Sequence, residues 1–257
     1  MLPEMKTLAI LQARMSSSRL PGKVGKDILG KPMLARQIER LLHARTIEKL
    51  VVATSTNQDD DAVAAIAASA GVECFRGSLD DVLDRFYQCA LQYRPQWIIR
   101  LTGDCPLADW RIVDAVTDFA VSGSYDYASN AKETSFPDGL DVEVVRFDAL
   151  ETAWREAELK SDREHVLPFI HRQSERFSIG HFKYHEDLSD MRWTVDEPTD
   201  LEFVRAVYGE LYPGNPDFSF EDILHLIARK PGLSAINGGI PRNEGYLKSL
   251  LRDKQGE

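Results

Sequence analysis

Close to the N-terminus the chain reads Leu8-Ala9-Ile10-Leu11-Gln12-Ala13-Arg14-Met15-Ser16-Ser17-Ser18-Arg19-Leu20-Pro21-Gly22-Lys23, an apolar run that leads directly into a cationic loop. Such a loop at the carboxyl end of a buried strand is where open α/β sheets bind ligands, because side chains and backbone N–H groups converge there. Arg14 and Arg19 can each grip phosphate oxygens through two hydrogen bonds, and Lys23 adds a compact charge. The loop predicts a polyphosphate clamp; the alternative, for an arbitrary basic loop, is a set of solvated charges.

Two common phosphate-binding loops do not fit this stretch. Val24 follows Lys23 at the position where a P-loop carries Ser or Thr for magnesium, and no glycine stands five positions before Gly22. The stretch also lacks a G-x-G-x-x-G string. The loop therefore belongs to neither class.

Strands and helices alternate along the first half of the chain. Apolar spacing predicts strands at residues 7–12, 49–55, 72–75 and 97–101, and helices at residues 32–42, 59–70, 79–92 and 111–121. Ser78 is the expected N-cap of the helix at 79–92, and Asp59, Asp60 and Asp61 indicate a solvated helix start. This alternation predicts a mostly parallel sheet covered by helices, a Rossmann-like three-layer α/β/α architecture.

The second half of the chain is richer in turns. We expect strands at residues 126–130, 140–145 and 177–183, and helices at residues 147–159, 162–173, 198–208 and 221–228. The charged tail at 252–257 is expected to fray. We find no internal repeat, and we interpret the chain as one domain with an inserted lobe.

Composition agrees with a cytoplasmic enzyme. The 257 residues carry a net charge of −10, which argues against a general nucleic-acid binder because the cations are local. Three scattered cysteines indicate reduced thiols without a disulfide framework or a cysteine zinc site. No apolar run approaches the ~20 residues that a bilayer span needs, and the N-terminus has no signal-peptide layout. We therefore expect neither nucleic-acid nor membrane partners.

Asp104 is the second chemical anchor. It follows the predicted strand at 97–101, in the turn Thr102-Gly103-Asp104-Cys105-Pro106. A carboxylate at a strand's carboxyl end, beside a phosphate loop, is well placed to bind magnesium. The alternative is an aspartate that caps the next helix or fixes its own turn.

These strings together resemble the cytidylyltransferases that make CMP-activated acidic sugars, the group of the CMP-Kdo and CMP-sialic acid synthetases. Within that group the chain is most similar to the spore-coat polysaccharide biosynthesis type. The resemblance spans roughly residues 7–210. Besides the cationic loop, it is carried by Gly30-Lys31-Pro32-Met33, Val52-Ala53-Thr54-Ser55-Thr56, Phe75-Arg76-Gly77-Ser78, Asp81-Val82-Leu83-Asp84-Arg85, Leu101-Thr102-Gly103-Asp104-Cys105-Pro106-Leu107, Arg163-Glu164-His165-Val166 and Trp193-Thr194-Val195-Asp196.

The resemblance implies a GT-A-like nucleotidyltransferase fold and a single domain over 1–257. Residues 5–125 would form the nucleotide-binding half, residues 126–190 an acceptor and dimerisation lobe, and residues 191–257 the return to the core with the C-terminal helices. A homodimer in the cytoplasm is expected. The implied reaction transfers CMP from CTP to an acidic sugar, resembling a nonulosonic acid, with release of pyrophosphate.

The resemblance also implies roles for individual residues. Mg²⁺ would bind Asp104 and Asp196, and Asp200 would be helix N-terminal structure. The implied catalytic residues are Arg14, Lys23, Asp104 and Asp196. The implied nucleotide-binding residues are Leu11, Gln12, Ala13, Arg14, Arg19, Lys23, Thr54, Ser55, Arg76 and Asp104. The implied acceptor-binding residues are Asn130, Asp138, Asp141, Glu143, Arg163, Glu164 and His165.

Some of these residues have simpler interpretations. Arg163 and Glu164 can form a pair on a helix's first turn, and His165 can be a satisfied structural histidine. Two other functions also stay open: a glycosyltransferase of related architecture, and a non-catalytic nucleotide-binding protein. Gly103-Asp104-Cys105 supplies only one carboxylate where a glycosyltransferase usually has an Asp-x-Asp pair, and pyrophosphate release separates the two enzymes.

Overall fold

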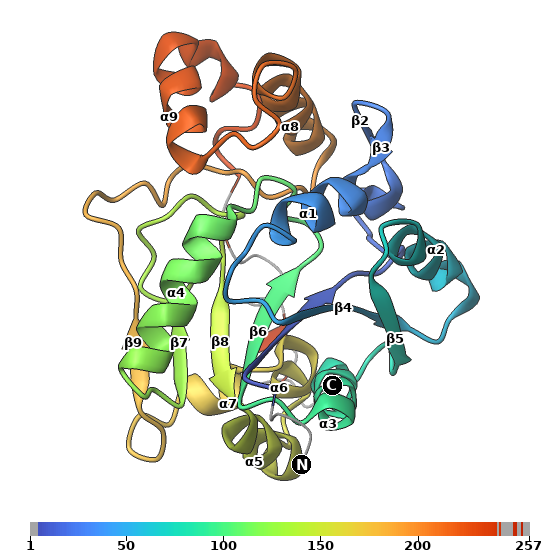
Figure 1. Cartoon of the computed structure of the whole chain (residues 1–257), viewed down its shortest axis with the longest axis vertical. Helices are drawn as coiled ribbons and strands as arrows, with labels where there is room; N and C mark the ends of the chain where they lie inside the picture. The colour runs from blue at the N-terminus through green and yellow to red at the C-terminus, as the bar shows by residue number, and fades with distance from the viewer. Residues whose placement is uncertain (1–4, 241, 243–248, 251–252, 254–257) are drawn as a thin grey trace.

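A seven-stranded sheet forms the centre of the computed structural model, which describes residues 5–240, 242, 249–250 and 253 (Figure 1). In sheet order the strands are β5 (Glu73–Gly77), β4 (Lys49–Ser55), β1 (Thr7–Gln12), β6 (Trp97–Thr102), β8 (Glu143–Arg146), β7 (Tyr127–Ser129) and β9 (Ile179–His181). The first four pair in parallel, whereas β8 runs antiparallel to both β6 and β7. The predicted mostly parallel sheet is confirmed.

Two hydrophobic clusters cover the two faces of this sheet. Side chains of β1 alternate between them: Ala9 and Leu11 join one cluster, and Leu8 and Ile10 join the other. The first cluster packs under α1 (Met33–Leu41), α2 (Asp61–Ser69), α4 (Trp110–Ser122), α8 (Pro198–Leu211) and α9 (Phe220–Arg229). The second packs under α3 (Val82–Tyr93), α5 (Phe147–Glu156) and α7 (Pro168–His171). The three-layer α/β/α architecture is therefore confirmed.

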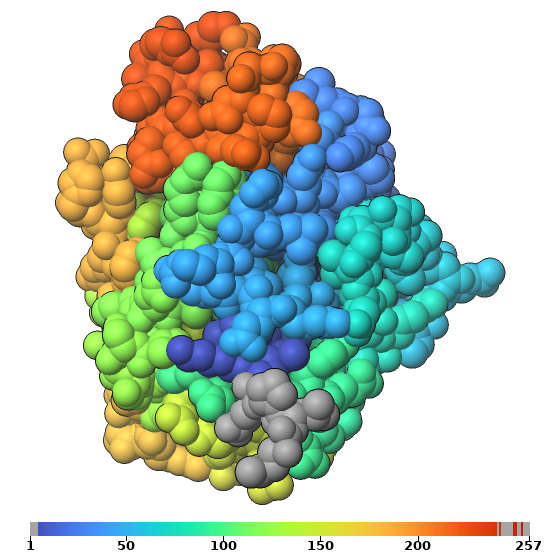
Figure 2. Space-filling view, viewed as in Figure 1, coloured from blue at the N-terminus to red at the C-terminus, as the bar shows by residue number. Residues whose placement is uncertain are grey.

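Smaller elements extend this core. A short hairpin of β2 (Asp27–Ile28) and β3 (Lys31–Pro32) precedes α1, and α8 and α9 lie together at one end of the molecule (Figures 1 and 2). Short 3₁₀ turns occur at Lys23–Gly25, Gln58–Asp60 and Pro231–Leu233. No helix in the described ranges is long and apolar enough to cross a membrane.

The helix expected at residues 162–173 is in fact two short helices. α6 (Lys160–His165) ends at Val166, whose φ of 74° is outside the helical range, and α7 begins at Pro168. Proline is favoured in the first turn of a helix, where its missing N–H costs no hydrogen bond, so Pro168 starts a new helix here.

Other boundaries also differ from expectation. α3 begins at Val82 with Asp81 as N-cap, which accepts a hydrogen bond from the Asp84 N–H, whereas Ser78 accepts from the Asp81 N–H one turn earlier. The second-half strands β7, β8 and β9 are each shorter than predicted. The expected fraying at 252–257 lies outside the described residues apart from Asp253. The predicted lobe boundaries at 126 and 190 stay predictions.

Candidate functional site

A cavity of about 1000 Å³ opens at the carboxyl ends of β1 and β6. The two strands are neighbours, and Gln12 at the end of β1 lies in register with Thr102 at the end of β6. Gly103 then donates a hydrogen bond from its N–H to the Gln12 carbonyl at 2.7 Å. A Cβ at Gly103 would lie 2.9 Å from that of Ala13, so only glycine allows this close approach. The sheet thereby brings the cationic loop and the Asp104 turn to one place.

The cationic loop is held by a buried carboxylate. Asp60 accepts a 2.7 Å hydrogen bond from the Met15 N–H, and its other oxygen accepts from the N–H and hydroxyl of Ser55. Burial opposes ionisation, but these hydrogen bonds outweigh it and lower the pKa of Asp60. Asp60 is only 2% exposed, so the prediction that all three residues of 59–61 are solvated is wrong.

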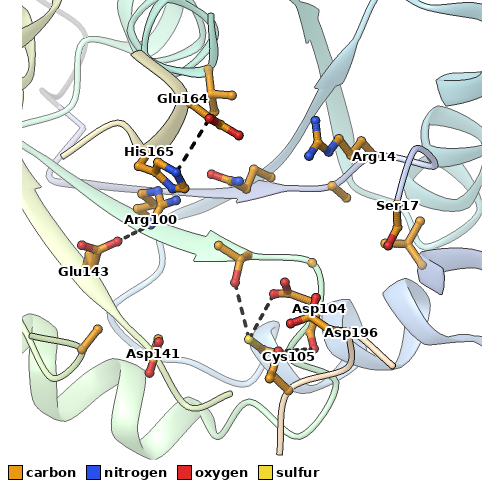
Figure 3. A pocket seen from close by; sticks show the side chains of 18 of the residues that line it. Arg14, Ser17, Arg100, Asp104, Cys105, Asp141, Glu143, Glu164, His165 and Asp196 are labelled. Atoms are coloured by element: carbon orange, nitrogen blue, oxygen red, sulfur yellow. Dashed lines mark hydrogen bonds and ion pairs between the residues drawn. The ribbon is translucent and has the colours of Figure 1, made fainter. Parts of the chain in front are cut away.

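Lys23 joins the two predicted magnesium ligands. Its Nζ lies 2.8 Å from Asp196 Oδ1 and 3.3 Å from Asp104 Oδ2, and it also donates to the Val195 carbonyl at 2.9 Å. Burial opposes ionisation of Asp104, but the Lys23 charge outweighs it and lowers the pKa of Asp104 to about 2. The pKa of Lys23 is raised, because the two carboxylates outweigh its burial. Figure 3 shows Asp104 and Asp196 side by side at the cavity wall.

The donor set of this pair fits Mg²⁺. Mg²⁺ prefers oxygen ligands and is commonly held by one or two carboxylates together with substrate phosphates and water. Asp104 and Asp196 supply two carboxylates, and both of them contact Lys23. Among the described residues, no group of three or more acidic, histidine or cysteine side chains is arranged to hold a metal alone. A magnesium ion at this pair would therefore take its remaining ligands from phosphates and water.

Two arginines support Asp196 from other directions. Arg19 lies 3.0 Å from Asp196 Oδ2 and 3.5 Å from the Glu197 carboxylate. Arg192 lies 3.2 Å from Asp196 and grips Asp200 through two hydrogen bonds. Asp200 is fully buried and completes a capping box with Glu197 at the start of α8. The expectation that Asp200 is helix N-terminal structure thus agrees with its position.

Asp138, Asp141 and Glu143 line one end of the cavity, which Arg192 connects to Asp196 by lying 3.1 Å from Asp138 and 3.2 Å from Asp196. Burial raises the pKa of Asp138, and it raises the pKa of Asp141 to about 7. The pKa of Glu143 shifts in the opposite direction. Arg100 contacts its carboxylate, and the Tyr127 hydroxyl donates a hydrogen bond to it at 2.6 Å. Burial opposes ionisation of Glu143, but the Arg100 charge outweighs burial and lowers the pKa of Glu143 to about 2.

Arg163, Glu164 and His165 reach the same end from α6. The Arg163 guanidinium grips the Asp81 carboxylate, with Nη2 at 2.6 Å, and donates to the Trp154 carbonyl, so it anchors α6 to α3. Arg163 also lines the cavity, and its predicted grip on an acceptor carboxylate stays a prediction. Figure 3 shows the His165 ring beside Arg100, and burial lowers the pKa of His165.

Three predicted nucleotide-binding side chains lie away from the cavity. Leu11, Thr54 and Ser55 are fully buried within the sheet. Contacts between these three side chains and a base are therefore corrected, whereas contacts through their backbone groups stay a prediction. Sequence alone does not show which residues near the end of a strand are buried by the helices packed on the sheet.

Two further predicted residues have structural partners. Arg76 lies on the outer strand β5, where it pairs with Asp61 and donates to the carbonyls of Ser55 and Asn57. Asn130 is fully buried, and its amide bridges the backbones of Leu140 and Val142. The cavity therefore does not receive either side chain, and their assignments to nucleotide and acceptor are corrected.

The cavity also holds cations that sequence reasoning left unassigned: Arg85, Arg100, Lys132 and Arg192. Arg85 is 2% exposed, and burial, reinforced by the nearby Arg14, lowers its pKa to about 10. Arg100 interrupts the apolar run of β6, and a charge inside such a run is a usable signal. Arg85 belongs to a segment that carries the resemblance, but that segment does not show in which direction the Arg85 side chain points.

Comparison with known proteins adds independent findings. The family model described as "Cytidylyltransferase" matches residues 8–218. The Bacillus subtilis spore coat polysaccharide biosynthesis protein SpsF is 33% identical, over 87% of this chain and 95% of its own length. An uncharacterized protein of Methanocaldococcus jannaschii, MJ1063, is 33% identical over 94% of this chain and 98% of its own.

Solved structures agree with this pattern. A cytidylyltransferase from Leptospira borgpetersenii superposes with a TM-score of 0.87 at 32% identity, covering 93% of this chain and all of that one. A CMP-2-keto-3-deoxy-manno-octonic acid synthetase complexed with CTP superposes with a TM-score of 0.64 at 21% identity, covering 80% of this chain and 99% of its own. The second likeness concerns the fold alone.

Proposed function

This chain belongs to the cytidylyltransferase family and is a nucleotidyltransferase, and we propose that it transfers CMP from CTP to an acidic sugar with release of pyrophosphate, for a surface polysaccharide or glycan. The observation that carries the proposal is the meeting of Lys23, Asp104 and Asp196 at the end of β1 and β6. A phosphate-binding cation and two carboxylates that can hold Mg²⁺ share one wall there.

The cationic loop would bind the triphosphate. Arg14 is exposed in the cavity, and Arg19 and Lys23 stand beside Asp196. Together they can neutralise the β- and γ-phosphates and the pyrophosphate that leaves. Arg85, buried next to Arg14, adds positive charge where water is excluded, and electrostatic attraction is stronger there.

Asp104 and Asp196 would hold Mg²⁺ against the phosphates. When bound, the ion supplies charge neutralisation at the phosphoryl oxygens and lowers the pKa of a coordinated hydroxyl. Cys105 is fixed beside this pair and donates from Sγ to Asp104 Oδ1 at 3.4 Å. The polypeptide itself orients the two carboxylates and excludes water from one side of them.

In the proposed reaction an acceptor hydroxyl oxygen forms a bond to the α-phosphorus of CTP. The bond from that phosphorus to the bridging oxygen breaks, pyrophosphate leaves with the electron pair, and the hydroxyl proton is released. No covalent bond to the protein is needed, so the protein contributes position and charge. Asp138, Asp141 and Glu143 are placed to receive acceptor hydroxyls, and Arg100 and Lys132 bring positive charge for an anionic acceptor.

Pyrophosphate release tests this function. The full chain is incubated with magnesium, each of the four nucleoside triphosphates, and a panel of 2-keto sugar acids. We expect release with CTP and an accepted sugar acid only, and a loss of ~10²-fold or more in Asp104→Asn. Asp118→Asn, an exposed aspartate of α4 paired with Arg45, is the matched control and should keep full activity. Release with another nucleotide, or full activity in Asp104→Asn, would refute the proposal.

A further inference from the structure

Three described residues after α9, namely Asn237, Arg242 and Ser249, contact residues that line the cavity. We call the described residues after α9 (230–240, 242, 249–250 and 253) the C-terminal segment; they lie beyond residue 218, where the family model ends. Asn237 from this segment donates to the Arg192 carbonyl at 2.9 Å and to Asp200 at 3.0 Å. Two later residues, Arg242 and Ser249, contact side chains that line the acceptor end of the cavity.

Arg242 touches two cavity carboxylates at once. Its Nη2 donates to Asp141, its Nε lies 3.7 Å from Asp138, and its Nη1 donates to the Phe136 carbonyl at 3.1 Å. The Arg242 and Asp138 side chains are each only 14% exposed, so solvent screens their attraction weakly. Asp138 itself is fixed nearby, because its N–H and carbonyl pair with the backbone at Met191 and Trp193.

Ser249 connects the two α6 residues of the cavity. Its Oγ donates to Glu164 at 2.8 Å and lies 3.0 Å from His165 Nε2. A hydroxyl has one proton, and here the carboxylate takes it, so the same oxygen must accept from His165. His165 is therefore held as the Nε2–H tautomer, with its other ring nitrogen, Nδ1, unprotonated in the neutral ring.

The charge balance at this end depends on Arg242. Asp138, Asp141, Glu143 and Glu164 bring four carboxylates to the acceptor end. Arg100 pairs with Glu143, Arg192 donates to Asp138 at 3.1 Å, and Arg242 contacts Asp138 and donates to Asp141. Without Arg242, Asp138 would keep Arg192, but Asp141, where it is ionised, would lose its arginine and would repel an anionic sugar while offering it the same hydrogen-bond acceptors. The cation supplied by the C-terminal segment makes these carboxylates compatible with an acidic acceptor.

We propose that the C-terminal segment determines acceptor binding: Arg242 is a positioning residue that lets an anionic sugar approach Asp138 and Asp141, and Ser249 is a positioning residue that sets the tautomer of His165. This inference rests on the proposed function. It adds to the acceptor end two residues from outside the part of the chain that the family model covers.

Arg242→Gln tests the charge argument. We expect its KM for the accepted sugar acid to rise about tenfold or more, with the KM for CTP changed less than about twofold, because the lost charge faces only the acceptor end. The double variant Arg242→Gln with Asp141→Asn restores the charge balance and should recover most of the acceptor KM. Arg45→Gln removes an exposed arginine from its pair with Asp118 and is the matched control. Thermal unfolding of each variant shows that it is folded.

Ser249→Ala tests the tautomer argument without an acceptor. In ¹⁵N NMR spectra of the full chain, His165 should show a protonated Nε2 in the wild type and a mixture of tautomers in Ser249→Ala. Ser122→Ala, a surface hydroxyl on α4, should leave the His165 spectrum unchanged. The pH profile of kcat/KM for the acceptor should shift in Ser249→Ala only.

Three results would overturn the inference. In the first, Arg242→Gln changes the KM values for CTP and for the acceptor by the same factor, or it changes neither KM value. In the second, the double variant fails to recover. In the third, the His165 tautomer is the same in Ser249→Ala. A wild-type chain that turns over no sugar acid of the panel, with 3-deoxy-manno-octulosonate and N-acetylneuraminate as probes, would instead refute the proposed function and this inference with it.

Discussion

Lys23 has two possible partners for a single charge. In the structure its ammonium lies between Asp104 and Asp196, and in the proposed complex it binds phosphate. One ammonium group cannot contact the two carboxylates and the phosphate equally well at the same time. Binding of the triphosphate would draw Lys23 away from the carboxylates and leave them for Mg²⁺, so nucleotide and metal should bind with positive cooperativity.

The first prediction follows from this competition. Lys23→Met removes the positive charge from between two carboxylates, so Mn²⁺ without nucleotide should bind about tenfold tighter than to the wild type, while CTP binds more weakly. Electron paramagnetic resonance titration of Mn²⁺ measures the first effect. Lys31→Met, which removes a half-exposed lysine paired with Glu39, is the control. Unchanged or weaker Mn²⁺ binding would contradict this account.

The second prediction concerns Asp141 and pH. Its pKa rises from the ordinary 3.8 to about 7 on folding, chiefly through burial. Between these values the native chain binds more protons at Asp141 than the unfolded chain, so this group's contribution to stability falls as pH rises from about 4 to about 7. Asp104 and Glu143 have lowered pKa values and act in the opposite sense at lower pH.

Melting temperatures measured from pH 5 to pH 8 test this. Relative to the wild type, Asp141→Asn should gain stability as pH rises, because it removes a carboxylate that is costly to ionise when buried. Asp118→Asn should follow the wild type. A constant difference between Asp141→Asn and wild type across this interval would show that Asp141 titrates normally.

At the scale of elements, the N-terminus of α8 joins the fold to the site. Asp200 accepts hydrogen bonds from the N–H groups of Asp196 and Glu197 and from Arg192 and Asn237. The same carboxylate thus caps the helix and positions the backbone of the proposed metal ligand Asp196. Loss of this cap would therefore displace Asp196, one of the two proposed metal ligands.

The third prediction is that Asp200→Ala lowers the free energy of unfolding by about 3 kcal/mol, because it leaves the buried Arg192 without its main partner. Asp222 occupies the same capping-box position in α9 with Ser219 but holds no buried arginine. Asp222→Ala should cost only about 1 kcal/mol. Urea denaturation compares the two, and equal losses would contradict the role assigned to the Arg192 pair.

Elements were predictable where the pattern is local. Short continuous apolar runs at β1, β4 and β6 located the parallel strands, and strand ends located the Asp104 turn beside the cationic loop. The break at Val166 was not predicted, since the apolar spacing continues across it. The ion-pair partners of charged side chains were also not predictable. Arg163 pairs with Asp81, which is 82 residues away in sequence, and only tertiary packing decides that pairing.

The same limit explains the misplaced site residues. Thr54 and Ser55 belong to a segment that carries the resemblance, but whether the last side chains of a strand reach the cavity depends on the layers that cover the sheet. Conversely, Arg242 lies beyond residue 218, where the family model ends, and only the fold brings it to Asp141. Composition and motif therefore identified the chemistry, whereas the acceptor end required the structure.

At the scale of the whole molecule, the resemblance predicts a homodimer, and this is our fourth prediction. Light scattering coupled to size-exclusion chromatography should give twice the chain mass of 29.0 kDa. The expected interface lies in the lobe at 126–190, which the family is expected to use for pairing. A mass of one chain at micromolar concentration would contradict it.

The most direct test of the central claim is product identification. The full chain is incubated with CTP, magnesium and an accepted sugar acid, and the mixture is followed by ³¹P NMR and mass spectrometry. The account predicts one CMP ester of the sugar and one pyrophosphate for each CTP consumed. CDP with a sugar phosphate, or transfer of a sugar from a nucleotide supplied in place of CTP, would contradict it.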